Sequence, residues 1–418
     1  MKVVLLAVGS RGDVAPMVAL GRELSGRGVA VTVVALADYA ALVSAAGLRP
    51  AIVAVSMAES VAAVAGGTAA VSRSVLAYTR GVSRWLAGIA PAVVDTTLAA
   101  VEPGDLIVAG LLSFDDAAAL AEARGCRVLH ALFAPLLPTA HGPSTLAAVR
   151  PRSTTRLNTW AGSLALTVTA GMATTTGRHL RDRLGLRHTS ARGFVDLVRR
   201  TPALAAMSPL VVPPAPDWPE TALSTGFWVE TGPAGEPDPQ LRDFVAAGPA
   251  PVCVGFGSVG DTDVDLVTAA ARRARQRVVV VAPEASASAT AGPGLDMAGA
   301  LVVRAAPFRW LFPRSAAVIH HGGAGTTAES LLAGRPTGVV ATGADQPYFG
   351  RRLAELGAGP PPLHRRDLTV DRLATLMSAL TGPDRSFRSY AGEIAAERGA
   401  AIAADHIVAH LRRTTPFE

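Results

Sequence analysis

The strongest chemical signal in the sequence is a glycine-rich run that ends one apolar segment and opens a helical one. It comprises His320-His321-Gly322-Gly323-Ala324-Gly325-Thr326-Thr327. Glycines let a ligand approach the backbone closely, and a helix N-terminus offers free N–H groups and a positive dipole end. The His321 imidazole and the two threonine hydroxyls add donors. The run therefore predicts a phosphate cradle, although a glycine-rich loop alone also suits a tight turn.

The elements that must position this run indicate an α/β chain with two doubly wound halves. In the first half, apolar runs at 3–8, 29–36, 106–112 and 127–133 alternate with helical stretches, which suits strands covered on both faces. A Pro-rich passage at 209–219 breaks the pattern, and strand-like runs resume at 251–256. Two Rossmann-like units facing each other would create a cleft for ligands.

Composition limits the class of protein further. The 418 residues are 50% apolar and 17% charged, which indicates a globular chain of two or three domains. The net charge of +6 is a weak field for this length, so we expect no nucleic-acid partner. Cys126 and Cys253 lie in apolar stretches, so we expect no disulfide framework and a reducing, cytoplasmic location.

Two apolar segments must be weighed as a signal peptide or a membrane span. The N-terminus resembles a first strand rather than a signal peptide, because its apolar run is short and lacks a cleavage site. The uncharged stretch 157–177 is long enough to span a bilayer, but Asn158, its glycines and its threonines favour a buried or half-buried helix. We expect no transmembrane segment, while peripheral membrane contact remains open.

The glycine-rich run lies within a longer stretch that resembles the donor-binding signature of family 1 GT-B glycosyltransferases. This stretch is WLFPRSAAVIHHGGAGTTAESLLAGRPTGVVATGADQPYFGRRLAELGAG, residues 310–359. The subgroup it most resembles contains sterol glucosyltransferases and bacterial enzymes that decorate antibiotics. Residues 9–14 (GSRGDV) resemble that subgroup's first loop and 254–258 (VGFGS) its second, with further likeness in PLLPT at 135–139 and GFW at 226–228. Residues 40–105 and 140–205 carry little that is recognisable.

The resemblance implies a GT-B fold: an acceptor-binding domain at 1–210, a linker at 211–240, a nucleotide-sugar domain at 241–390, and a C-terminal helix at 391–418 that packs back on the first domain. It implies a donor diphosphate site formed by Ser258, His321, Gly322, Gly323, Gly325, Thr326 and Thr327. These donors would stabilise the leaving diphosphate as its charge grows, so neither a metal nor another cofactor is expected.

The resemblance also assigns the rest of the donor site. It places the nucleobase and ribose near Phe308, Trp310 and Glu329, although a purely structural Trp310 is equally compatible with the sequence. It places Asp345 and Gln346 on the donor sugar, whose hydroxyls a carboxylate and an amide can bind.

Asp13 is the general base that the resemblance implies, within an acceptor loop that includes Ser10, Arg11 and Gly12. Aspartate is a weak base near pKa 3.9 unless burial raises its pKa. Asp13 could also cap a helix that begins near Pro16. Asp115 and Asp116 are the nearest candidates for a supporting partner of the base.

Other motifs have simpler interpretations. Asp261-Thr262-Asp263 matches the DxD pattern of metal-dependent transferases, yet acidic residues are also favoured at the start of a helix. The arginines between 178 and 187 form either a solvated helix face or a surface for an acidic acceptor or membrane, and His130 and His141 are expected to be structural. This set is Arg178, Arg181, Arg183 and Arg187.

The sequence therefore predicts an inverting, metal-independent glycosyltransferase. It would move a sugar from a UDP or TDP donor to a hydroxyl or amine of a small natural product. A GT-B nucleotide-sugar epimerase and a non-catalytic auxiliary protein are the alternatives. The sequence fixes neither the acceptor nor the oligomeric state.

Overall fold

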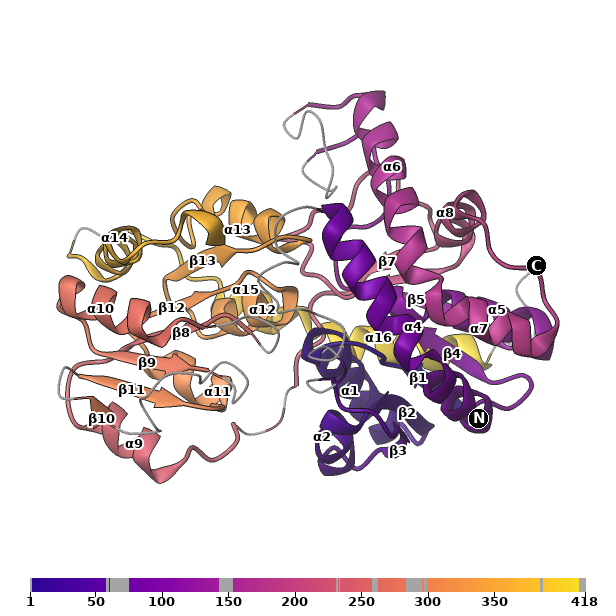
Figure 1. The fold of residues 1–418 in the computed structure, drawn as a ribbon, viewed down its shortest axis with the longest axis horizontal. Helices are drawn as coiled ribbons and strands as arrows, with labels where there is room; N and C mark the ends of the chain where they lie inside the picture. The colour runs from indigo at the N-terminus through magenta and orange to yellow at the C-terminus, as the bar shows by residue number, and fades with distance from the viewer. Residues whose placement is uncertain are drawn as a thin grey trace. The chain divides into compact units, whose positions relative to one another are not determined.

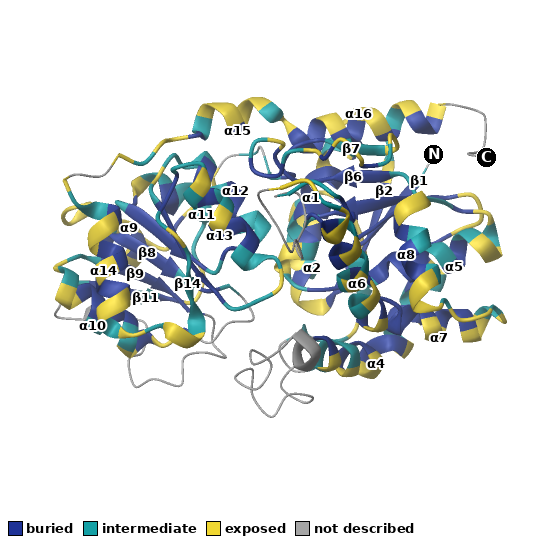
Figure 2. Cartoon of the chain, turned by 90° about the horizontal axis from the view of Figure 1, so that it is seen from above, coloured by how far each residue is buried: buried dark blue, intermediate teal, exposed yellow. Residues whose placement is uncertain are grey.

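The computed structural model describes residues 2–57, 60, 75–142, 153–230, 232, 234–257, 262–282, 295–296, 299–383 and 386–412. The chain divides into two compact units. Unit 1 contains Met1–Glu230 and Glu397–Glu418, and unit 2 contains Thr231–Ala396 (Figure 1). In both units the central strands are buried and the exposed residues lie mainly on the outer sides of helices (Figure 2).

Unit 1 is built on a parallel sheet whose strands follow the order β3-β2-β1-β4-β5-β6-β7. The strands are β1 (Lys2–Leu6), β2 (Ala30–Leu36), β3 (Arg49–Val53), β4 (Leu106–Ala109), β5 (Arg127–Leu132), β6 (Ala203–Ala205) and β7 (Ala222–Ser224). The helices are α1 (Arg11–Gly26), α2 (Ala40–Ala45), α4 (Val75–Ala100), α5 (Phe114–Arg124), α6 (Arg156–Ala173), α7 (Thr175–Leu184), α8 (Ala191–Arg200) and α16 (Gly399–Arg412).

Unit 2 repeats this plan, with strand order β10-β11-β9-β8-β12-β13-β14 and only β10 antiparallel among the described strands. The strands are β8 (Val252–Gly255), β9 (Val278–Val281), β10 (Leu295–Asp296), β11 (Ala300–Val303), β12 (Ala317–His320), β13 (Thr337–Ala341) and β14 (Leu363–His364). The helices are α9 (Pro239–Ala246), α10 (Val264–Ala274), α11 (Phe308–Leu311), α12 (Ala324–Leu332), α13 (Gln346–Glu355), α14 (Val370–Thr381) and α15 (Ala391–Glu397). In each sheet the order reverses beside its first strand, β1 or β8, as in Rossmann folds.

The structure divides the chain later than the expected domain boundary. Residues 211–230 belong to unit 1, because β7 pairs with β6 in the register Ala203↔Ala222. Trp228 is buried in the same unit, edge-on to Phe133. The Pro-rich passage that we interpreted as a linker is thus largely the approach to an edge strand.

The C-terminal segment also differs from the single helix expected over 391–418. Residues 391–396 belong to unit 2, whereas α16 packs against α1 in unit 1. Arg27 Nε contacts Asp405 Oδ1 at 2.7 Å and ties these two helices together. Arg398, with φ of +48°, lies between α15 and α16 and separates them.

The stretch 157–177 falls mainly on α6, which is only partly buried. Asn158 is buried and donates to the carbonyl oxygens of Ala140 and Ser153. None of the described helices combines the length and apolarity needed to cross a membrane.

Candidate functional site

The turn after β12 is shaped by His320. Its buried Nδ1 accepts a hydrogen bond from the Gly322 N–H at 3.0 Å. Burial lowers the pKa of His320 to about 3, so the ring is neutral. Gly322 takes φ of +89°, a region where side chains are strained. His320 is therefore part of the turn, and His321 is the imidazole left to meet a ligand.

His321 lies in a space bordered by two glycines. A methyl group at Gly323 would lie 2.4 Å from His321 Nε2, and one at Gly257 would lie 3.1 Å from its Cε1. Burial lowers the pKa of His321 to about 4, so it is neutral near pH 7 and one ring nitrogen carries a proton. Its buried Nδ1 has no partner among the described residues. An unpartnered polar atom beside a glycine loop suits a ligand acceptor.

The N-terminus of α12 has no side-chain cap, because the capping residue is Gly323. Hydrogen bonding back along the helix begins with Thr327 N–H to Gly323 O at 2.9 Å. The N–H groups of residues 324–326 precede this first bond and are positioned to bind an anion with the positive end of the helix dipole.

The two threonines that we predicted together are in different environments. Thr326 is half-buried in the first turn of α12, whereas Thr327 is fully buried. The Thr327 hydroxyl has no partner among the described residues. Thr326 is therefore the better placed of the two to reach a ligand.

Asp345 and Gln346 lie beside the glycine loop. A methyl group at Gly322 would lie 2.8 Å from the Gln346 carbonyl oxygen, so the loop packs against the start of α13. Gln346 Oε1 accepts from the Thr342 N–H at 2.8 Å. The amide oxygen thus closes its own turn, which leaves the NH2 group as the donor for a hydroxyl-rich ligand.

The predicted nucleobase region is partly a packing cluster. Phe308 stacks on Phe312 with ring centroids 4.5 Å apart, and the Arg314 guanidinium lies 4.7 Å from the Trp310 ring. Trp310 also packs against the apolar core of unit 2. These contacts give Trp310 a structural role, and its contact with a base remains a prediction, as does that of Glu329 in α12.

The remaining donor-side predictions fall partly outside the described residues. Ser258 and Asp261 lie there. Asp263, the second acidic residue of the DxD pattern, caps α10 by accepting from the Leu266 N–H at 2.9 Å. Within the part of the chain that the structure describes, no group of three or more His, Cys, Asp or Glu side chains could hold a metal.

In unit 1, Asp13 belongs to a capping box at the start of α1. Its Oδ2 accepts from the Ser10 N–H at 2.8 Å and the Ser10 hydroxyl at 3.0 Å. The helix begins at Arg11 rather than near Pro16, so Asp13 is its third residue and Ser10 is the N-cap. Ser10, Arg11 and Gly12 thus form one turn with Asp13, and Arg11 and Gly12 are exposed.

The environment of Asp13 favours proton uptake. Burial raises the pKa of its carboxyl, although the two hydrogen bonds from Ser10 oppose this effect. A methyl group at Gly9 would lie 2.4 Å from Asp13 Oδ2, so Gly9 makes room for the carboxylate. Both hydrogen bonds from Ser10 go to Oδ2, so Ser10 leaves the other carboxylate oxygen, Oδ1, free of these bonds.

Asp115 and Asp116, our candidates for a supporting partner, are engaged elsewhere. Asp115 Oδ1 contacts Arg181 Nε at 3.3 Å and the Thr189 hydroxyl at 2.6 Å. Asp116 Oδ2 accepts from the Thr176 hydroxyl at 2.6 Å, and burial raises its pKa to about 7. The bonds to Arg181 and Thr176 join α5 to α7, and the bond to Thr189 joins α5 to the segment after α7, so the pair stabilises the fold of unit 1. Arg181 is consequently buried rather than part of a solvated face.

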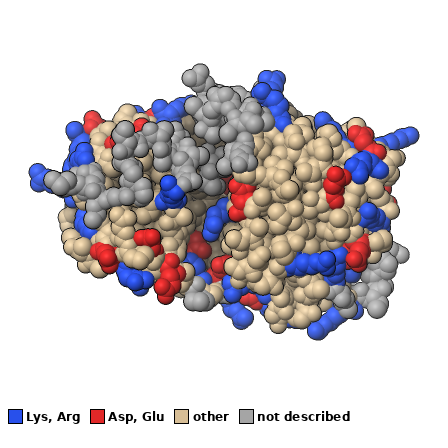
Figure 3. Space-filling model, turned by 60° about the horizontal axis from the view of Figure 1, so that its bottom comes forward, with Lys and Arg blue, Asp and Glu red and all other residues tan. Residues whose placement is uncertain are grey.

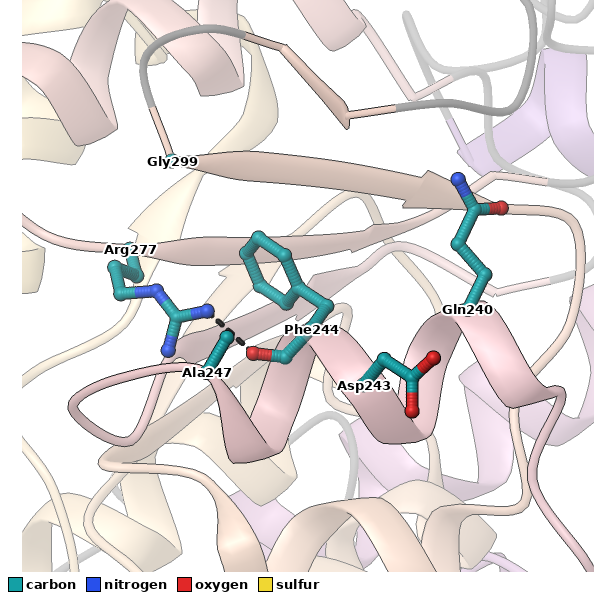
Figure 4. Close-up of a pocket in the computed structure, with 6 residues that line it drawn as sticks. All are labelled: Gln240, Asp243, Phe244, Ala247, Arg277 and Gly299. Atoms are coloured by element: carbon teal, nitrogen blue, oxygen red, sulfur yellow. Dashed lines mark hydrogen bonds between the residues drawn. The ribbon is translucent and has the colours of Figure 1, made fainter.

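A separate hollow of about 540 Å³ lies elsewhere in unit 2, lined by Gln240, Asp243, Phe244, Ala247, Arg277 and Gly299 (Figure 4). Arg277 donates to the Phe244 carbonyl oxygen, and its guanidinium lies 4.2 Å from the Phe244 ring. Arg277 and Gly299 directly precede β9 and β11, so the hollow is at the amino ends of the strands. Ligands of such sheets bind at the carboxyl ends, where the glycine loop lies.

Comparison with known proteins agrees with this architecture. Residues 259–413 match the family model described as erythromycin biosynthesis protein CIII-like, C-terminal domain. The chain is 35% identical over 202 residues to O-mycaminosyltylonolide 6-deoxyallosyltransferase of Streptomyces fradiae, which covers 47% of each chain. It is 28% identical over 439 residues to sterol 3-beta-glucosyltransferase UGT80B1 of Arabidopsis thaliana, covering 100% of this chain and 69% of that protein. The aligned part spans about half the length of the first relative.

A solved structure shows the same fold. The glycosyltransferase VinC in complex with DTDP superposes with a TM-score of 0.64 at 22% identity, over 98% of this chain and 99% of that one. The predicted GT-B fold of two Rossmann-like domains is confirmed. The chain has the GT-B fold and is similar in sequence to antibiotic glycosyltransferases and sterol glucosyltransferases.

In the sequence, Gly9 and Gly257 had no role beyond membership of two family-like loops. In the structure Gly9 makes room for the Asp13 carboxylate, and Gly257 makes room for the His321 imidazole. The available signal was a glycine directly after an apolar strand, a position where neighbouring loops converge.

Proposed function

We propose that this enzyme is an inverting glycosyltransferase that uses a UDP or TDP sugar and glycosylates a hydroxyl or amine of a small natural product. The carrying observation is the neutral His321 imidazole, held beside Gly257 and Gly323 next to the uncapped N-terminus of α12. These donors suit a nucleoside diphosphate, because its charge grows as it leaves the anomeric carbon. The DTDP bound by VinC supports the choice of nucleotide class.

The proposed reaction is a single displacement at the anomeric carbon. The acceptor oxygen or nitrogen forms the new bond to this carbon as the bond to the diphosphate oxygen breaks. Asp13 accepts the acceptor proton, and burial of its carboxyl brings its pKa closer to that task. Gln346 and Asp345 bind sugar hydroxyls, and no metal or cofactor takes part.

Calorimetry with UDP, TDP and GDP tests the donor site directly. We expect UDP or TDP to bind the parent protein, and His321→Ala to weaken binding at least tenfold, because it removes a charge-assisted hydrogen bond. A parent protein that binds none of the three nucleotides contradicts the proposal.

Turnover distinguishes the enzyme from its alternatives. Mass spectrometry of donor incubated with a panel of hydroxylated natural products should show a glycoside together with free nucleoside diphosphate. Nucleotide binding without any released diphosphate would favour an auxiliary protein, and conversion of the sugar without an acceptor would favour an epimerase.

A further inference from the structure

Helix α6 presents an apolar stripe to solvent. Leu157, Trp160 and Leu164 are 50%, 63% and 47% exposed. Their spacing of three and four residues places them on one side of the helix. The remaining large hydrophobic residue that is comparably exposed in the described chain is Ile402, on α16. We call Leu157, Trp160 and Leu164 the α6 stripe.

The segment that carries the α6 stripe also carries the excess positive charge of the chain. Residues 153–200 contain eight arginines and two aspartates, a net charge of +6. The whole chain also has a formal charge of +6, so the acidic and basic residues outside this segment balance. On the face drawn in Figure 3, for example, groups of both signs are interspersed.

The basic residues of this segment lie mostly on its surface. Helix α6 contacts α7 and α8, and Figure 1 shows the three helices grouped in unit 1. Six of the arginines are exposed in addition to Arg156, which precedes Leu157: Arg178, Arg183, Arg187, Arg192, Arg199 and Arg200. Helix α6 itself contains no acidic residue.

We propose that α6 lies on the surface of an anionic membrane, with the α6 stripe in the headgroup boundary and the neighbouring arginines on acidic lipid headgroups. A helix with an outward Trp and Leu face and basic flanks binds such interfaces without spanning them. A second copy of the chain is a poorer occupant. Each stripe side chain offers at most about 250 Å², and the three are half exposed, short of the roughly 800 Å² that each partner of a stable dimer buries.

Vesicle sedimentation tests this proposal and does not depend on the transferase activity. We expect the parent protein to bind vesicles of phosphatidylcholine with about 30% phosphatidylglycerol at least tenfold more tightly than phosphatidylcholine alone. Trp160→Ser/Leu164→Ser should weaken binding at least tenfold, because both side chains enter the interface. Ile402→Ser, an equally exposed residue on α16, should bind within twofold of the parent.

A second pair of variants isolates the charge. Arg199→Gln/Arg200→Gln should weaken binding to the anionic vesicles by about 25-fold, since each arginine near the surface contributes roughly fivefold. Arg49→Gln/Arg351→Gln, which removes two exposed arginines outside the segment, should have less than a twofold effect. Because all changed residues are exposed, we expect the variants to unfold at the parent's temperature, and this measurement checks that they fold.

Three results would overturn the proposal. The first is equal binding to neutral and anionic vesicles, or none. The second is parent-like binding by Trp160→Ser/Leu164→Ser. The third is a dimer in sedimentation velocity that this double variant abolishes, which would assign the stripe to a second copy of the chain.

Discussion

Replacing Gly323 by alanine tests whether the room around His321 makes the glycine loop a nucleotide site. Gly323 has φ of −67° and ψ of 149°, which alanine adopts without strain. The added methyl group would lie 2.4 Å from His321 Nε2, about 1 Å closer than ordinary contact allows. The imidazole must therefore move, and the Gly257 backbone limits how far it can shift.

The expected loss follows from the hydrogen bond that the displaced ring would make. A hydrogen bond to a charged group contributes about 1.5–3 kcal/mol, which corresponds to roughly 10- to 150-fold in affinity. We expect Gly323→Ala to weaken binding of UDP or TDP by this factor, measured by calorimetry, and to approach the affinity of His321→Ala. The double variant should be no weaker than His321→Ala alone, because both changes remove the same contact.

Gly392→Ala is the matched control. Gly392 lies in α15 of the same unit, and a methyl group there would meet nothing within 4 Å. This variant should bind nucleotide within twofold of the parent. If Gly323→Ala also keeps the parent's affinity, or if its loss adds fully to that of His321→Ala, the assigned role of the imidazole is wrong.

Three further predictions concern the proposed base Asp13, the independence of turnover from metal ions, and the buried His130. Asp13→Asn should keep nucleotide affinity within twofold but lower kcat at least 100-fold, and parent-like turnover would eliminate Asp13 as the base. Turnover should persist in excess EDTA, whereas activity that EDTA removes and magnesium restores would establish a metal requirement. Burial lowers the pKa of His130 to about 3, so the unfolded chain binds a proton below pH 6.5 that the native ring refuses. Stability from this residue is therefore complete above pH 6.5 and falls by about 2 kcal/mol by pH 5. His130 stacks on Phe114, so phenylalanine is a suitable replacement that binds no proton. In urea unfolding, His130→Phe should lose about 2 kcal/mol less stability between pH 7 and pH 5 than the parent protein. A variant with the same pH dependence as the parent would contradict this role of His130.

Much of the fold was predictable because both sheets are parallel, apart from β10, and are covered on both faces. The apolar run at residues 29–36, for example, nearly coincides with β2 (Ala30–Leu36), and the apolar segment before the glycine-rich run ends in β12 (Ala317–His320). β7 was missed because it is a three-residue edge strand embedded among prolines, where its pairing with β6 overrides the local turn signals. Composition cannot reveal such pairing.

Within the candidate site, the kinds of residue were easier to predict than their tasks. Thr326 and Thr327 are indistinguishable by type, yet only the turn of α12 decides that Thr327 faces the core. Asp115 and Asp116 look like a base partner in sequence, but Thr176 and Arg181 come from α7, about 60 residues away. Such roles depend on which helices pack together, and the sequence does not show which distant helices are neighbours.

The glycines of the candidate sites have two different structural roles. A glycine-rich loop is usually interpreted as backbone that approaches a phosphate, and Gly322 does take a conformation that favours glycine. Gly257 and Gly323 do something else: the volume their missing side chains would fill is occupied by the imidazole of His321. Gly9 makes the same kind of room for the Asp13 carboxylate in the other unit. In this chain the glycines near the proposed chemistry therefore position polar side chains as well as backbone, which is why single methyl groups are the sharpest tests of the mechanism.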